Sequence, residues 1–108
     1  MKVFELTEKL ELTPLVRGNS EAEIQGCYIG DLLSLVMSRA QEGEVWLTVQ
    51  TNVNIIAVAV LTEISCIIVT EGMDIPEETI AKAAEQGIPL FQSAQTSYEL
   101  ACALSKLL

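Results

Sequence analysis

The residues of this chain that could do chemistry are mostly carboxylates, and four of them lie close together. Oxygen ligands that suit a hard cation such as Mg²⁺ are present on Glu71, Asp74, Glu77 and Glu78. The same spacing also suits the first turn of a helix, where carboxylates interact favourably with free backbone N–H groups and the helix dipole. We therefore expect these acids to begin a helix, and we assign no metal site.

Other catalytic arrangements have little support in the sequence. The chain has no histidine, which removes the usual general base, the Ser-His-Asp arrangement and most zinc sites. Neither GxxxxGK[ST] nor GxGxxG occurs, so no phosphate-binding or dinucleotide loop is indicated. Cys27, Cys66 and Cys102 are far apart among apolar neighbours, and we expect all three to be buried thiols. We predict no enzymatic activity and no cofactor.

Charge excludes two classes of partner. Fifteen acidic against six basic residues give a net charge of -9 over 108 residues, and the basic residues are scattered. Nucleic acids and anionic membrane surfaces both require clustered Lys and Arg, so we expect neither as a partner. The opening MKVFELTEKLEL is interrupted by acids and does not fit a signal peptide, which favours a cytoplasmic location.

Apolar runs alternate with helical patterns along the chain. Strand-like segments are predicted near residues 13–16, 24–29, 45–49, 66–69 and 88–91, and amphipathic or apolar helical segments lie between and around them. This alternation predicts an α/β fold, with a largely parallel sheet flanked by helices in a single domain over residues 1–108. The run CIIV at 66–69 has no polar face, as expected for a strand buried on both sides.

Several residues are expected to cap these helices. We predict N-caps at Asp31, at Thr51 or Asn52, at Asp74, and at Thr96, where Glu99 completes a capping box. The helix that follows Asp74 should bury Ile80, Ala83 and Ala84 and end at Gly87.

The segment 53–62 is an apolar helix between two strands. It is apolar on nearly every side, so we expect it to be covered all round, with a second copy of the chain covering what one sheet cannot. A homodimer with this helix at or next to the interface is predicted.

Ligand-binding residues are expected at the ends of the parallel strands. Carboxyl ends of parallel strands and amino ends of the following helices meet at one edge, where open α/β sheets bind ligands. Each position alone is also what a plain helix cap looks like. The candidate ligand-binding residues are Gly30, Asp31, Thr51, Asn52, Thr70, Glu71 and Gly72.

The chain resembles the DRTGG domain family over nearly its whole length. Four features carry the resemblance: the strand-to-helix turn YIGDLLS, the strand VWLTVQTN with the following helix NIIAVA, the strand end IIVTEG, and the helix and strand in IPEETIAKAAEQGIPLF. Members of that family occur as regulatory modules beside CBS domains in some inorganic pyrophosphatases, in some phosphate acetyltransferases, and as small free-standing proteins labelled similar to HPr serine kinase. The resemblance implies a dimeric, non-catalytic α/β domain.

The name-giving motif of that family is altered here. Asn52-Val53 stands where the family pattern has Asp-Arg, and Thr70-Glu71-Gly72 where it has Thr-Gly-Gly. Without the Arg, the site lacks a bidentate donor for phosphate, and Glu71 adds a negative charge.

Three functions follow from these observations. The first is a non-enzymatic regulatory or interaction module that acts as a homodimer, with a metabolic enzyme as a candidate partner. The alternative is a sensor of a small metabolite or nucleotide at the strand ends. The third, a minimal metal-dependent enzyme using Glu71 and Asp74, has the least support.

Overall fold

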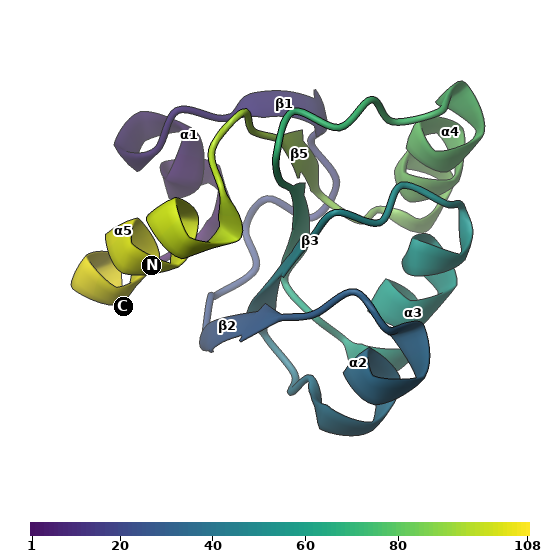
Figure 1. The fold of residues 1–108 in the computed structure, drawn as a ribbon, viewed down its shortest axis with the longest axis horizontal. Coiled ribbons are helices and arrows are strands. Elements are labelled where there is room, and N and C mark those ends of the chain that lie inside the picture. The colour runs from purple at the N-terminus through teal and green to yellow at the C-terminus, as the bar shows by residue number, and fades with distance from the viewer.

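A computed structural model describes all residues, 1–108, and its centre is a five-stranded sheet (Figure 1). The strands lie in the order β1-β5-β4-β3-β2. Strands β2 to β5 are parallel to one another, and β1 pairs antiparallel with β5 at one edge. The strand bounds are β1 Thr13–Val16, β2 Gly26–Ile29, β3 Glu44–Thr48, β4 Cys66–Val69 and β5 Leu90–Gln92. The predicted α/β fold with a largely parallel sheet is therefore confirmed.

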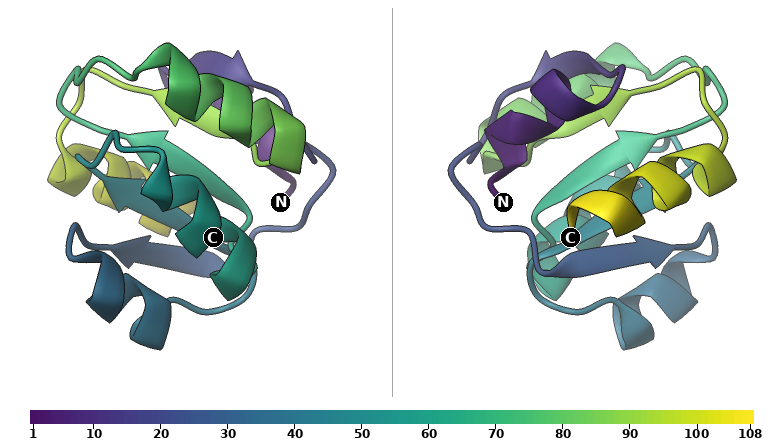
Figure 2. Two further views of the ribbon diagram at one scale, coloured as in Figure 1. Left: turned by 90° about the vertical axis from the view of Figure 1, so that its right-hand side faces the viewer. Right: turned by 90° about the vertical axis from the view of Figure 1, so that its left-hand side faces the viewer.

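Helices cover both faces of the sheet. The three that connect the parallel strands, α2, α3 and α4, lie on one face, whereas the N-terminal helices and α5 lie on the other (Figure 2). The helix bounds are η1 Val3–Glu5, α1 Leu6–Lys9, α2 Leu33–Arg39, α3 Asn54–Thr62, α4 Glu77–Gln86 and α5 Ser97–Leu107. The longest, α5, has 11 residues, and no helix combines the length and the apolar character that a membrane span requires.

The core is divided in two by the sheet, because successive side chains of a strand point to opposite faces. Trp46 and Ile67 pack against α2, α3 and α4, whereas Leu47 and Ile68 pack against the N-terminal helices and α5. All four residues of β4 are buried. This strand is paired on both sides and covered on both faces, as its apolar sequence predicts.

Two of the predicted helix ends are made as expected. The Thr96 hydroxyl accepts a hydrogen bond from the N–H of Glu99, and the Glu99 carboxylate accepts one from the N–H of Thr96, both near 3 Å. Gly87 ends α4 in the left-handed conformation with φ 71°. The predicted cap of α3 is wrong by one or two residues, because Val53 precedes this helix; Asn52 lies just before it, and its side-chain oxygen accepts from the N–H of Asn54 at 2.8 Å.

Two other predicted caps are wrong. Leu32, not Asp31, precedes α2, and Pro76, not Asp74, precedes α4; neither helix has a side-chain cap. The Asp31 carboxylate instead accepts hydrogen bonds from Thr48 Oγ1 and Val49 N, at 2.8 and 2.9 Å. Tertiary partners on the neighbouring strand thus replace the local capping bond.

Three predicted burials also need correction. Cys66 is buried, but Cys27 is half-buried and Cys102 is exposed. Ala84 is exposed beside the buried Ala83. On α3, Val60 and Leu61 are 43% and 68% exposed within one chain, so the cover of this outer side by a second copy stays a prediction.

Candidate functional site

The seven predicted ligand-binding residues lie on the three loops that follow β2, β3 and β4. Those loops come together at one edge of the sheet, on the left of the left-hand view in Figure 2. Hydrogen bonds join them: Asp31 bonds to the end of β3, and Glu71 N donates to Gln95 O in the loop after β5 at 2.9 Å. We call this surface the carboxyl edge.

Backbone N–H groups of the loop after β4 are engaged within the chain. The N–H groups of Thr70 and Gly72 donate to Thr48 O and Ser93 O at 2.9 and 2.8 Å. Thr70 is fully buried, and its hydroxyl lies 3.3 Å from that of Ser97. Because the N–H groups of residues 70–72 are all used within the chain, the loop after β4 suits a neutral or cationic group better than a phosphate.

Charge at the carboxyl edge points the same way. The carboxylates of Asp31, Glu71 and Asp74 are exposed there, and none of them forms an ion pair. Glu71 has a left-handed backbone with φ 64°. None of the four surface hollows of the molecule is lined by one of the seven residues. The carboxyl edge of a single chain is therefore an open, acidic surface.

Apolar side chains at the carboxyl edge were missed by the sequence analysis. Ile29 ends β2, Leu32 precedes α2, and Met73 lies in the loop before α4; all three are exposed. Tyr98, in the first turn of α5, is 76% exposed. Their positions just after strand ends were visible in the sequence, but apolar residues are usually assigned to the core there. They provide surface on which a flat, uncharged ring could pack.

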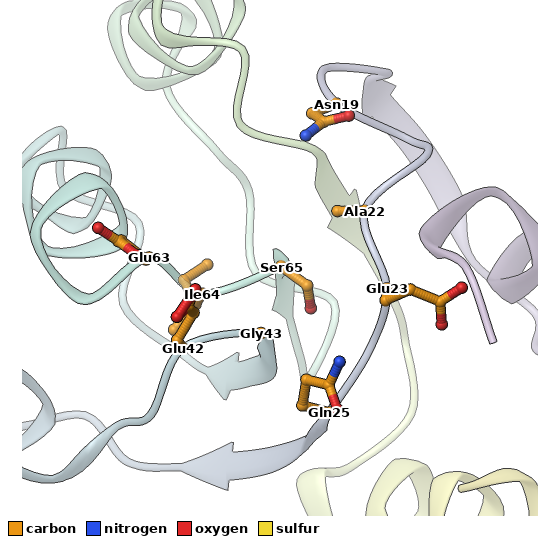
Figure 3. A pocket seen from close by; sticks show the side chains of 9 residues that line it. All are labelled: Asn19, Ala22, Glu23, Gln25, Glu42, Gly43, Glu63, Ile64 and Ser65. Atoms are coloured by element: carbon orange, nitrogen blue, oxygen red, sulfur yellow. The ribbon is translucent and has the colours of Figure 1, made fainter.

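The largest hollow lies at the opposite edge, where the parallel strands begin (Figure 3). It has a volume of about 560 Å³ and is lined by parts of the loops before β2, β3 and β4. Glu42 and Glu63 line it, while the carboxylate of Glu23 points away and pairs with the amino terminus at 3.1 Å. No basic residue lines this hollow, so it does not suit an anion.

The remaining groups that could react are the thiols and the potential metal ligands. Burial, with a smaller effect of the Glu44 charge, raises the pKa of Cys27 to about 11. Burial raises the pKa of Cys66 to about 12. Both thiols are protonated near neutral pH and are therefore poor nucleophiles. No three His, Cys, Asp or Glu side chains come together as a set that could hold a metal ion.

Comparison with known sequences places the second half of the chain in a described family. The family described as HPr Serine kinase N terminus matches residues 46–108. A 46-residue stretch is 44% identical to the HPr kinase/phosphorylase of Bacillus mycoides (strain KBAB4) and 41% identical to that of Bacillus cytotoxicus. That stretch covers 43% of this chain and only 15% of each relative.

Comparison with solved structures extends the likeness to nearly the whole chain. The CBS and DRTGG domains of the regulatory region of Clostridium perfringens pyrophosphatase, complexed with the activator diadenosine tetraphosphate, match with a TM-score of 0.76. The match covers 99% of this chain and 47% of that one, at 14% sequence identity. At this identity the likeness is one of fold.

Proposed function

This chain belongs to the family of HPr serine kinase N-terminal domains, and on that premise we propose that it is a non-enzymatic regulatory module of the DRTGG type that acts as a homodimer. Two findings support the regulatory role. The family takes its description from the N terminus of the kinase, and the similar fold in the pyrophosphatase comes from that protein's regulatory region. The identical stretch covers only a small part of each kinase, so no kinase activity is transferred to this chain.

The observation that carries the proposed dimer is the uncovered outer face of α3. Ala57, Val60 and Leu61 face outward on this helix, and Leu61 is 68% exposed. Fully burying such a side chain stabilises an association by about 1.5–3 kcal/mol, so Leu61 alone contributes about 1–2 kcal/mol from each protomer. A two-fold interface would count this contribution twice.

Electrostatic repulsion favours the outer face of α3 over the other surfaces as the contact between two copies of the chain. Two chains of net charge -9 repel each other wherever acids face acids. Helix α3 has no ionisable residue between Asn54 and Thr62, so it can approach its own copy without that repulsion. A shallow groove of about 250 Å³ continues the surface toward Lys82 and Gln86 of α4. This groove offers a place for the partner's Leu61.

Light scattering behind a sizing column tests the dimer. At tens of micromolar the chain should have about twice its mass of 11.7 kDa. Leu61→Glu should give a folded monomer, because the dimer would then desolvate two carboxylates, and Lys82, the one base in the groove, is already paired with Glu85. Tyr98→Glu is the matched control, since Tyr98 is at least as exposed but lies on α5, across the sheet. A monomeric wild type, or equal loss with both variants, contradicts the proposal.

A sensor of a small metabolite or nucleotide at the carboxyl edge is the alternative function. The pyrophosphatase region of similar fold was solved with a diadenosine activator, and exposed Tyr98 and Leu32 could pack against an adenine ring. A thermal screen with adenine nucleotides and glycolytic metabolites, each with and without Mg²⁺, tests this. Ligand at 100 times its dissociation constant adds about 2.7 kcal/mol of stability, a readily measured shift. A binding ligand should lose its shift in Asn52→Ala. An unmoved melting point throughout contradicts the sensor.

We also propose that the chain turns over no phosphorylated substrate. It has no histidine and no P-loop, and its basic residues do not cluster to neutralise a transferring phosphate. Assays with ATP, acetyl phosphate and pyrophosphate should give no rate above buffer. Turnover that survives repurification and disappears in Glu71→Gln would contradict this, and would support the metal-dependent enzyme instead.

A further inference from the structure

A second hollow lies at the outer edge of the sheet, between β1 and the N-terminal helices. It has a volume of about 370 Å³, within the range of small-molecule sites. Its walls are apolar: Phe4 comes from η1, Pro14 and Leu15 from β1, and Phe91 from β5. We call it the β1 pocket. None of the seven predicted ligand-binding residues lies in it.

The β1 pocket contains one charged group, the guanidinium of Arg17. Among the basic side chains without an ion pair, Arg17 alone lines a hollow. Its Nε donates to Ser20 Oγ at 3.1 Å, and Ser20 is only 7% exposed. This bond orients the guanidinium while its two terminal nitrogens make no bond within the chain. No acid lines the pocket, although the chain has fifteen.

The segment that carries Arg17 and Ser20 is held in place from both sides. The Asn19 N–H donates to Gly87 O at 2.9 Å, and Phe4 N donates to Ser20 O at 2.9 Å. The first bond ties the turn to the end of α4, and the second ties it to η1. The guanidinium and the apolar walls therefore keep a fixed relation, which lowers the cost of ordering a bound ligand.

From this arrangement we propose that the β1 pocket binds a small carboxylic acid with an apolar or aromatic body. A guanidinium presents two parallel N–H donors that match a carboxylate, and the Phe, Pro and Leu walls take the apolar body. One positive group balances one negative charge, whereas a phosphate dianion would keep an unbalanced charge in a strongly acidic protein. The volume of about 370 Å³ admits roughly twelve non-hydrogen atoms, at about 30 Å³ each.

Phenylacetate and its uncharged analogue phenylacetamide test the proposal on the full chain. Titration followed by ¹⁵N–¹H NMR should show saturable shifts at Phe4, Arg17 and Phe91 with phenylacetate, with a dissociation constant on the order of 1 mM. Phenylacetamide should bind at least about tenfold more weakly, because it cannot form charge-assisted bonds with the guanidinium. Isovalerate should behave like phenylacetate, which would show that an aliphatic body is accepted.

Variants separate the pocket from general charge effects. Arg17→Gln should weaken phenylacetate binding at least about tenfold and remove the preference for acid over amide. Arg39→Gln is the matched control, because Arg39 also lacks an ion pair but lies on α2 and lines no hollow, and it should bind as the wild type does. Phe4→Ala should weaken both probes alike, since it removes an apolar wall and leaves the charge.

Several outcomes overturn the proposal. They are an absence of saturable shifts at 20-fold the expected dissociation constant, about 20 mM, an acid preference that persists in Arg17→Gln, and equal loss in Arg39→Gln. Tight binding of a peptide that ends in phenylalanine, together with no binding of phenylacetate, would assign the pocket to a protein partner instead. If Arg17→Gln fails to fold, the comparison of acid with amide on the wild type still decides.

Discussion

Replacing Gly18 by alanine probes how the turn after β1 is fixed against the rest of the fold. Gly18 has φ +52°, and an added Cβ would lie 2.5 Å from Pro89 N, 2.6 Å from Gly87 O and 2.7 Å from Ile88 C. All three are backbone atoms, so no side-chain rotation can relieve the contact. The turn has to move away from the segment between α4 and β5.

The expected loss of stability has two parts. A left-handed backbone costs an L-residue about 1–2 kcal/mol relative to glycine. Movement of the turn also breaks the bond from Asn19 N to Gly87 O, which contributes about 1 kcal/mol. Gly18→Ala should therefore destabilise the domain by about 2–3 kcal/mol, a large part of the 5–15 kcal/mol of a typical domain.

Urea unfolding followed by circular dichroism measures this loss, and Gly87→Ala is the matched control. Gly87 has φ +71° but no atom within 4 Å of an added Cβ, so its replacement introduces backbone strain without a clash. We expect Gly87→Ala to cost about 1–2 kcal/mol, with the m-value unchanged in both variants. A Gly18→Ala loss no larger than that of Gly87→Ala would refute the close contact between this turn and the α4–β5 segment.

Three further predictions concern local features. Thr96→Ala removes the capping box of α5 and should lower the free energy of unfolding by about 1 kcal/mol in the same urea assay; no loss would contradict the cap. Glu63→Gly relieves a left-handed φ of 57° at the end of α3 and should raise the free energy of unfolding by about 0.5–1 kcal/mol. A decrease would contradict the backbone strain at this position. Burial raises the pKa of Cys66 to about 12, whereas the unfolded chain has a Cys pKa of about 8.5. The stabilisation from the neutral buried thiol is therefore complete below about pH 8.5 and is lost as the pH rises toward 12. The free energy of unfolding should therefore fall more steeply between about pH 9 and 11 in the wild type than in Cys66→Ala, and equal slopes would contradict it.

Strands, crossover helices and the family resemblance could be predicted because each rests on local pattern. The run CIIV became the buried strand β4, and the apolar helix at 53–62 became α3. The resemblance to the DRTGG and HPr kinase family is confirmed by the family match over residues 46–108. In these segments the local preference and the tertiary fold agree.

The predictions from sequence were wrong where tertiary contacts compete with local ones. Asp31 has the sequence context of a cap, but pairing of β2 with β3 brings Thr48 and Val49 within reach of its carboxylate. Cys102 is exposed because Leu100 and Leu104 define the buried face of α5, and a residue midway between them points the other way.

The candidate sites were predictable only in part. Loops after parallel strands converge for topological reasons, so the location of the carboxyl edge could be predicted, whereas the use of its N–H groups within the chain could not. The β1 pocket combines Phe4, Arg17 and Phe91, which are far apart in sequence. No local pattern relates such residues, so this pocket becomes visible only in the folded chain.

The proposed dimer through α3 is tested most directly by a distance between two copies of Leu61. A spin label on Leu61→Cys, in a Cys102→Ser background that removes the exposed thiol, reports that distance by pulsed electron resonance. Helices that pack together have axes about 8–10 Å apart, so facing α3 helices should give a narrow distribution below roughly 30 Å, and dilution with unlabelled chain should reduce its amplitude. The absence of any dipolar coupling in a labelled chain that light scattering shows to be folded and dimeric at tens of micromolar would contradict an interface formed by α3.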